Sequence, residues 1–113
     1  MSDTYNKVKV ILKAGTLHEE VDLLPYMKTT QITAQCYDSN GDPATGNGGD
    51  TVGINAAPVG NPSGDSLDPA TITLATPTIV KYPDTFLESC IITIGGMPTG
   101  VEEVHVTIMQ SIH

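Results

Sequence analysis

The sequence predicts an all-β protein built as an antiparallel β-sandwich, and three observations carry this prediction. Short segments in which apolar and polar residues alternate recur along nearly the whole chain. Clusters of Gly, Pro, Asn and Asp separate these segments, as turns do between short strands. Segments with helical periodicity are scarce, which leaves a sandwich of about seven strands as the expected architecture.

Size and composition indicate one folded domain over residues 1–113. Hydrophobic residues make up 39% of the chain and charged residues 16%, which is typical of a globular domain. No uninterrupted run of about 20 apolar residues is present, so we expect no membrane span. The N-terminus has no apolar segment of the secretory type, so we expect assembly in a reducing cytoplasm.

The first expected strand covers residues 7–13. Its alternation directs one row of side chains inward, Val8, Val10 and Leu12, and a second row outward, Lys7, Lys9 and Lys13. The next segment, "LHEEVDLLPYM", has three apolar residues at helical spacing, but Pro25 ends any helix within about two turns. We therefore expect either a single helical turn or a short strand "EEVDLL" there.

Six further segments alternate in the same way. The inward side chains that they predict are Ile32, Ala34 and Cys36; Val52, Ile54 and Ala56; Ile72 and Leu74; Ile79; Cys90, Ile92 and Ile94; and Val104, Val106 and Ile108. In the last strand His105, Thr107 and Met109 should face outward. Residues 57–69 have the composition of a long loop, which we expect to be functional or ordered by a partner.

The stretch "CYDSNGDPATGNGGD", residues 36–50, resembles a metal or phosphate loop at first sight. Asp38, Asn40 and Asp42 have calcium-loop spacing, but Pro43 and Gly49 occupy the positions where such a loop needs Gly and Glu. A phosphate loop fails because no lysine follows "GNGGD". The stretch therefore predicts a turn, and we expect no metal and no cofactor.

The charge balance excludes several classes of partner. Thirteen acidic residues stand against five lysines and no arginine, which gives a net charge of −8. Nucleic acids and anionic membranes bind proteins through Lys and Arg, so we expect neither as a partner. We also expect no enzymatic activity, because His18, His105 and His113 lie far apart and no nucleophile motif is present.

Two cysteines, Cys36 and Cys90, fall on inward positions of two predicted strands. An inter-sheet disulfide is conceivable from these positions. Buried cysteines in a reducing compartment behave as small hydrophobic residues, so we expect a free, buried pair.

A strand that ends in "DSNGDP" resembles the Asp-x-x-Gly-x-Pro turn of bacterial and phage immunoglobulin-like domains. Together with "SLDPATITLATPTIV" and "DTFLESCIITIGGMPTGVEEVHVTIMQ", it resembles small accessory virion proteins of tailed bacteriophages. The resemblance implies an immunoglobulin-like β-sandwich that decorates the capsid, in many copies, as trimers or monomers. Its partners would be the major capsid protein or other virion proteins, and its location the virion; a tail or neck component is the alternative.

Two candidate binding sites follow from the residues. Lys7, Lys9 and Lys13 give an acidic molecule one positive strand, which either docks on an acidic partner or guards a sheet edge against aggregation. The alternative function, a carbohydrate or cell-surface binding module, would use Tyr37, Asp38 and Asn40. The commoner role for Tyr37 is to pack over the rim of the sheet.

Overall fold

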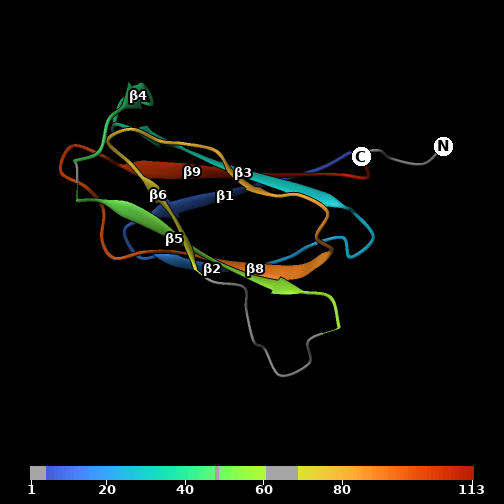
Figure 1. Cartoon of the computed structure of the whole chain (residues 1–113). Coiled ribbons are helices and arrows are strands. Elements are labelled where there is room, and N and C mark those ends of the chain that lie inside the picture. Colours follow the sequence, from blue (N-terminus) through green and yellow to red (C-terminus); the bar gives the residue numbers. More distant parts are fainter. Residues whose placement is uncertain (1–4, 48, 61–68) are drawn as a thin grey trace.

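The computed structural model describes residues 5–47, 49–60 and 69–113, and within these ranges it contains strands and no helix. The strands form two antiparallel sheets packed face to face (Figure 1). The predicted antiparallel β-sandwich is thereby confirmed. Sheet A contains β1 (Tyr5–Lys13), β9 (Glu103–Ser111), β3 (Thr29–Tyr37), β4 (Pro43–Ala44) and β7 (Val80–Tyr82). Sheet B contains β2 (His18–Asp22), β8 (Leu87–Ile94), β5 (Thr51–Pro58) and β6 (Ala70–Thr73).

The order of the strands specifies the sandwich further. Sheet A runs β1-β9-β3, with β7 and the very short β4 pairing along the other side of β3. Sheet B runs β2-β8-β5-β6. Consecutive strands thus alternate between the sheets for much of the chain, as in the eight-stranded jelly roll, whereas the resemblance had implied immunoglobulin-like connectivity.

Alternating residues build the core between the two sheets. The inward rows predicted for the strands that became β1, β3, β5, β8 and β9 are buried, and so are Ile72 and Leu74. Val8 is the one partly buried member of these rows, because it lies on the edge strand β1. Each strand therefore presents one face to the core and one to solvent, as a period of two requires.

Three sequence expectations need correction. Residues His18–Asp22 form strand β2, so the helical turn considered there was wrong and the short strand is confirmed. Ile79 was expected inside but is 53% exposed. The strand comprises only Val80–Tyr82 of the segment "PTIVKY", and its inward residues are Val80 and Tyr82, which pair with the buried Ile32 and Thr30, respectively. Finally, Ala57 and Pro58 belong to β5 and not to the loop.

The described part of the chain forms nine strands where about seven were expected. The two additions are β2 and β4, and β4 comprises only two residues. The part of the expected loop at residues 61–68 lies outside the described residues.

Both cysteines are buried and free, as expected. Burial raises the pKa of the Cys90 thiol to about 11. It also raises the pKa of Cys36, a shift that a backbone hydrogen bond to Gly46 partly offsets.

One fully buried amide joins the ends of three segments. The Gln110 side chain accepts hydrogen bonds from Asn6 Nδ2 (2.9 Å) and from the backbone N–H of Leu24 (3.0 Å). It donates one from Nε2 to the Leu24 carbonyl oxygen at 3.1 Å. These bonds tie β1 and the β2–β3 connection to β9, since buried polar groups are stable only when they are paired.

Candidate interaction surface

The outward side of sheet A brings together most of the residues that the sequence singled out. On β1 the outward residues include Lys7, Lys9 and Lys13, all exposed. The strand registers place Lys13 opposite Glu103 and Glu103 opposite Tyr37, so these three side chains form one row across β1, β9 and β3. The structure therefore joins the lysine strand and Tyr37 into a single face, a link that the sequence did not indicate.

An aromatic and ionic cluster lies at one end of this face. The Tyr37 and His105 rings have their centroids 4.4 Å apart and are inclined by 43°. His105 Nε2 lies 2.9 Å from Glu103 Oε1, and the His105 side chain is only 17% exposed. His105 is therefore an outward residue, as predicted, but it is packed rather than fully solvated. Tyr37 packs over the sheet, which is the role that the sequence favoured for it.

The face is cationic although the molecule is acidic. Lys81 on β7 lies opposite Gln31 and so joins the three lysines of β1 on the same side of the sheet. Within the strands of sheet A, four outward lysines against one glutamate, Glu103, give a net charge of +3, whereas the whole chain carries −8. Sequence reasoning missed Lys81 because Ile79 was expected to face inward, and alternation then places Lys81 on the inward side as well.

Asp38 and Asn40 have a local structural role. Asp38 Oδ1 accepts hydrogen bonds from the backbone N–H groups of Asn40 (2.9 Å) and Asp42 (3.0 Å). Gly41 has φ +81°, a conformation that glycine adopts without strain. The predicted turn is thus confirmed, and it commits one carboxylate oxygen of Asp38 to the backbone.

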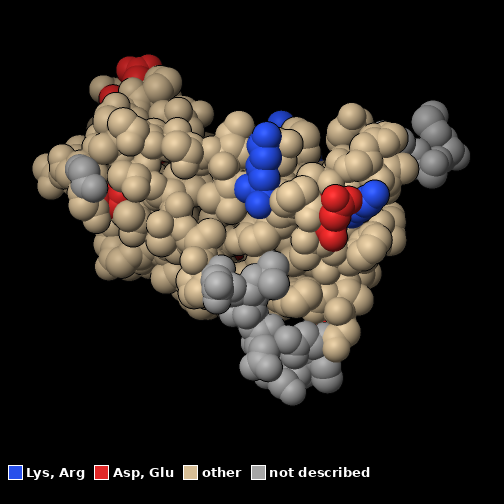
Figure 2. Space-filling view, viewed as in Figure 1, with Lys and Arg blue, Asp and Glu red and all other residues tan. Residues whose placement is uncertain are grey.

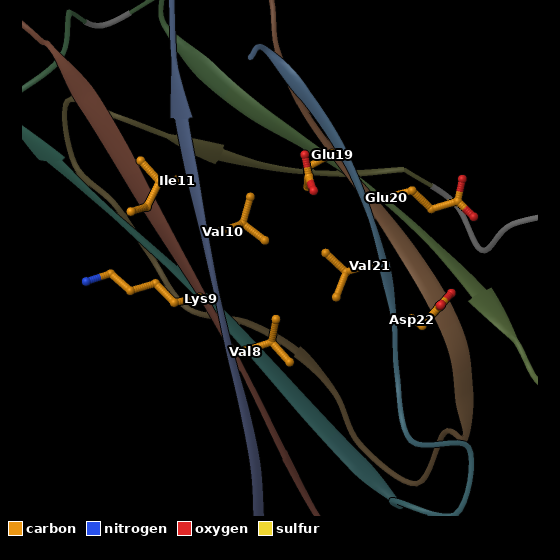
Figure 3. A pocket seen from close by; sticks show the side chains of 8 residues that line it. All are labelled: Val8, Lys9, Val10, Ile11, Glu19, Glu20, Val21 and Asp22. Atoms are coloured by element: carbon orange, nitrogen blue, oxygen red, sulfur yellow. The ribbon is translucent and has the colours of Figure 1, made fainter.

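An open groove of about 360 Å³ separates β1 from β2, the two edge strands on the same side of the sandwich (Figure 3). Apolar residues lie along it: Val10 is 5% exposed, Val21 is 8% exposed and Val8 is partly buried. Lys9 and Ile11 line the β1 side, and Glu19, Glu20 and Asp22 line the β2 side. Among the described strands, β9 is the only partner of β1 and β8 the only partner of β2.

The two edges of this groove carry opposite charges. On β2 every residue except Val21 is exposed, and three of the five are acidic. Glu20 and Asp22 alternate with the buried Val21, so they lie on the outward side of sheet B, as the lysines do on sheet A. Most of the described surface on the side shown in Figure 2 is uncharged. Charge is thus distributed unevenly, with a positive and a negative strand flanking one apolar groove.

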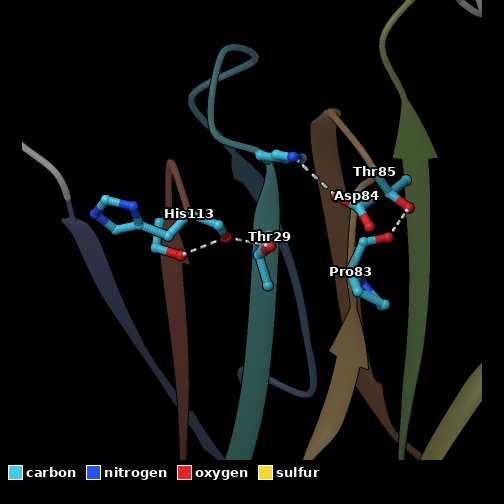
Figure 4. A network of polar contacts seen from close by, with 7 residues as sticks. Thr29, Pro83, Asp84, Thr85 and His113 are labelled. Carbon is cyan, nitrogen blue, oxygen red and sulfur yellow. Dashed lines mark hydrogen bonds and ion pairs between the residues drawn. The ribbon is translucent and has the colours of Figure 1, made fainter.

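A second hollow lies at the end of the sandwich where three connections meet. It has a volume of about 530 Å³ and is lined by Pro25, Pro58, Val59, Asp84, Thr85 and Phe86. Phe86 is 48% exposed, and Tyr26, which follows Pro25 in the chain, is 60% exposed. An ion pair of 3.2 Å between Lys28 Nζ and Asp84 Oδ1 and a 2.9 Å bond from Thr85 Oγ1 to the Pro83 carbonyl oxygen order the rim (Figure 4). This hollow could not be predicted from the sequence, because its walls come from separate segments.

Within residues 5–47, 49–60 and 69–113 no three His, Cys, Asp or Glu side chains lie close enough together to hold a metal ion. The same residues contain no helix that could cross a membrane.

Comparisons with known proteins do not assign this chain to a family. No family model and no curated protein matches the chain. Among solved structures, a Bacillus endospore appendage protein, described as belonging to a family of disulfide-linked pili, aligns with 14% identity and a TM-score of 0.45. That alignment covers 96% of this chain and 88% of the other. The Drosophila NLP core, described in terms of pentamer formation and histone binding, aligns with 15% identity and a TM-score of 0.49, over 92% and 96% of the two chains.

Proposed function

We propose that the protein is a non-enzymatic structural subunit that joins a larger protein assembly through β1. Its most concrete form is an accessory protein of a bacteriophage virion, bound in many copies to the assembled shell. A position at the neck or tail is the variant of the same proposal. The partners in that assembly would be the major capsid protein or other virion proteins, together with further copies of this chain.

The observation that carries this proposal is the character of β1. It is a nine-residue edge strand with exposed lysines on its outward side, next to a groove with an apolar floor. An edge strand can extend its sheet with a strand from a partner, whose backbone then supplies the hydrogen bonds. Complementary charge would favour docking on an acidic surface and oppose docking on a basic one.

The fold is compatible with this role by analogy. Jelly-roll sandwiches occur in viral capsid proteins and also in lectins, so the architecture admits both functions considered from the sequence. The analogy supports a virion role, which is also the role that the resemblance of the sequence to accessory virion proteins implies, although the strand order differs from the immunoglobulin-like one of that resemblance.

A carbohydrate-binding role is the second candidate, but at a different place from Tyr37. The Tyr37 ring already packs against His105, whereas the exposed Phe86 lines the hollow together with Asp84, and the exposed Tyr26 follows the lining residue Pro25 in the chain. Sugars bind to exposed aromatic rings with polar groups nearby. Binding on a glycan array that is lost in the Phe86→Ala variant would favour this candidate, and a blank array would remove it.

Charge reversal on β1 tests the docking role. The triple variant Lys7→Glu, Lys9→Glu, Lys13→Glu should fold but no longer sediment with particles that lack the protein, because three attractive contacts become repulsive. Lys28→Glu is the control, since Lys28 lies outside sheet A's strands and pairs with Asp84. Unchanged binding of the triple variant would mean that the lysines only protect the edge.

A further inference from the structure

We infer that the acidic surface that β1 meets is strand β2 of a second copy of this chain. Two copies would then join by their open sides, each β1 pairing with the β2 of the other. The inference rests on the proposed function, because it names the partner of the same strand. It also assigns a role to the acidic strand β2, which neither the sequence nor the proposed function had used.

The directions of the two strands allow this pairing. Within one chain β1 and β2 are joined by a tight connection, closed by an antiparallel bridge between Lys13 and Thr16, so they run in opposite directions. A two-fold axis parallel to the strands keeps the direction of β1 and exchanges the two layers. Each β1 therefore meets a β2 that runs antiparallel to it, and both pairs form at once in a closed, isologous dimer.

The side chains match in one register. If Val8 lies opposite Val21 of the second copy, Lys7 lies opposite Asp22 and Lys9 lies opposite Glu20. All four charged residues are then on the outward face of the joined sheet, because they alternate with the inward valines. Opposite charges placed directly across antiparallel strands stabilise the pair, and like charges destabilise it. The two-fold symmetry doubles each of these contacts.

The groove explains why a partner is favoured there. Val10 and Val21 are more than nine-tenths buried, but the groove beside them is open, and the backbone edges of β1 and β2 have no strand partner among the described residues. A second copy would cover these valines and supply the missing backbone partners. Only Glu19 opposes the pairing, since it lies on the same side of β2 as Val21 and would face Val10.

A charge exchange tests the inference. Sedimentation equilibrium of the purified full chain should show a monomer–dimer equilibrium that weakens as salt is added. Lys9→Glu and Glu20→Lys should each weaken dimerisation at least about tenfold, because each change makes two contacts repulsive. The double variant Lys9→Glu, Glu20→Lys should restore it, since the pairs are again opposite in sign.

Controls separate pairing from edge protection. Lys28→Glu makes the same change of charge away from the groove and should leave dimerisation unchanged. Glu19→Gln removes an unpaired carboxylate from the joint and should tighten the dimer. If Lys9 and Glu20 instead protect the edges, neutral variants such as Lys9→Gln would increase association, which would overturn the inference. A chain that stays monomeric at all concentrations would overturn it as well.

The outcome of the dimerisation test can be distinguished from the outcome of the virion docking test. Particle binding by a strictly monomeric protein would refute the dimer and leave the proposed function standing. If the charge-exchange variants behave as expected but the protein binds no particle, the dimer would stand and the proposed virion role would be refuted.

Discussion

At the scale of single residues, the fold depends on a few buried groups whose partners are far away in the sequence. Gln110 is the clearest case, because its amide reaches Asn6 near one end of the chain and Leu24 in the β2–β3 connection. The alternation in β9 predicted neither its complete burial nor its partners, since a period of two marks the face and not the contact. From the sequence alone, a glutamine at an inward position is expected to destabilise the core, whereas in the structure three hydrogen bonds pair its amide.

Replacing Gln110 tests this role. Gln110→Leu keeps the volume but leaves the Leu24 N–H and carbonyl without partners, so it should lower the free energy of unfolding by about 1–3 kcal/mol. Gln31→Leu, on the outward side of β3, should change it by less than about 0.5 kcal/mol. Urea unfolding of the two variants measures the difference, and equal losses would show that the buried bonds are not what stabilises this corner.

The buried thiol of Cys90 makes stability depend on pH. The unfolded thiol ionises near pH 9.0, whereas burial raises the pKa to about 11 in the folded state. The contribution of the buried, neutral thiol to the free energy of unfolding is therefore complete below pH 9 and is lost as the pH rises towards 11. It amounts to about 2–3 kcal/mol, from the size of the pKa shift.

Denaturant unfolding across this pH range should show the decrease in the free energy of unfolding. The Cys90→Ala variant should be less stable at neutral pH, but its free energy of unfolding should change less between pH 9 and 11. The Cys36→Ala variant should retain most of the pH dependence of the free energy of unfolding. Alkylation of the unfolded protein without reductant should add two groups, because both thiols are free. An undiminished slope in Cys90→Ala would assign the pH dependence to other groups.

At the scale of elements, the prediction succeeded where a strand alternates over many residues. The inward rows of β3, β5, β8 and β9 follow directly from their sequences, because burial of one face imposes a period of two. It failed at β7, where three residues are too few to fix the phase, and Ile79 was taken for an inward residue. It could not detect β4, whose two residues exist as a strand only through pairing with Cys36 and Tyr37.

The turn between β3 and β4 gives a test at this scale. Asp38→Ala removes the acceptor of two backbone hydrogen bonds and should lower stability by about 1 kcal/mol. Asp38→Asn keeps the oxygen and should cost less. Asp42→Ala is the matched control, because Asp42 takes part through its backbone. Thermal unfolding would rank the stabilities of the three variants. A loss of stability in Asp42→Ala as large as in Asp38→Ala would contradict the role assigned to the Asp38 carboxylate.

At the scale of the whole molecule, the sandwich is electrically polarised along its open side. The lysines of β1 and the acids of β2 were visible in the sequence, but their relation was not, because alternation within a strand does not reveal which strands are neighbours. The jelly-roll order pairs β1 with β9, nearly the whole chain away, and leaves both β1 and β2 at sheet edges. Only the folded chain places a cationic and an acidic strand on either side of one groove.

We propose that this protein is a structural subunit that assembles in many copies through β1. Electron cryo-microscopy of phage particles, with mass spectrometry of the same sample to establish that the protein is present, tests it most directly. We expect jelly-roll density at repeated positions on the particle, with β1 of each copy against a neighbouring chain. Absence of the protein from every particle, or copies that dock with β1 facing solvent, would contradict it.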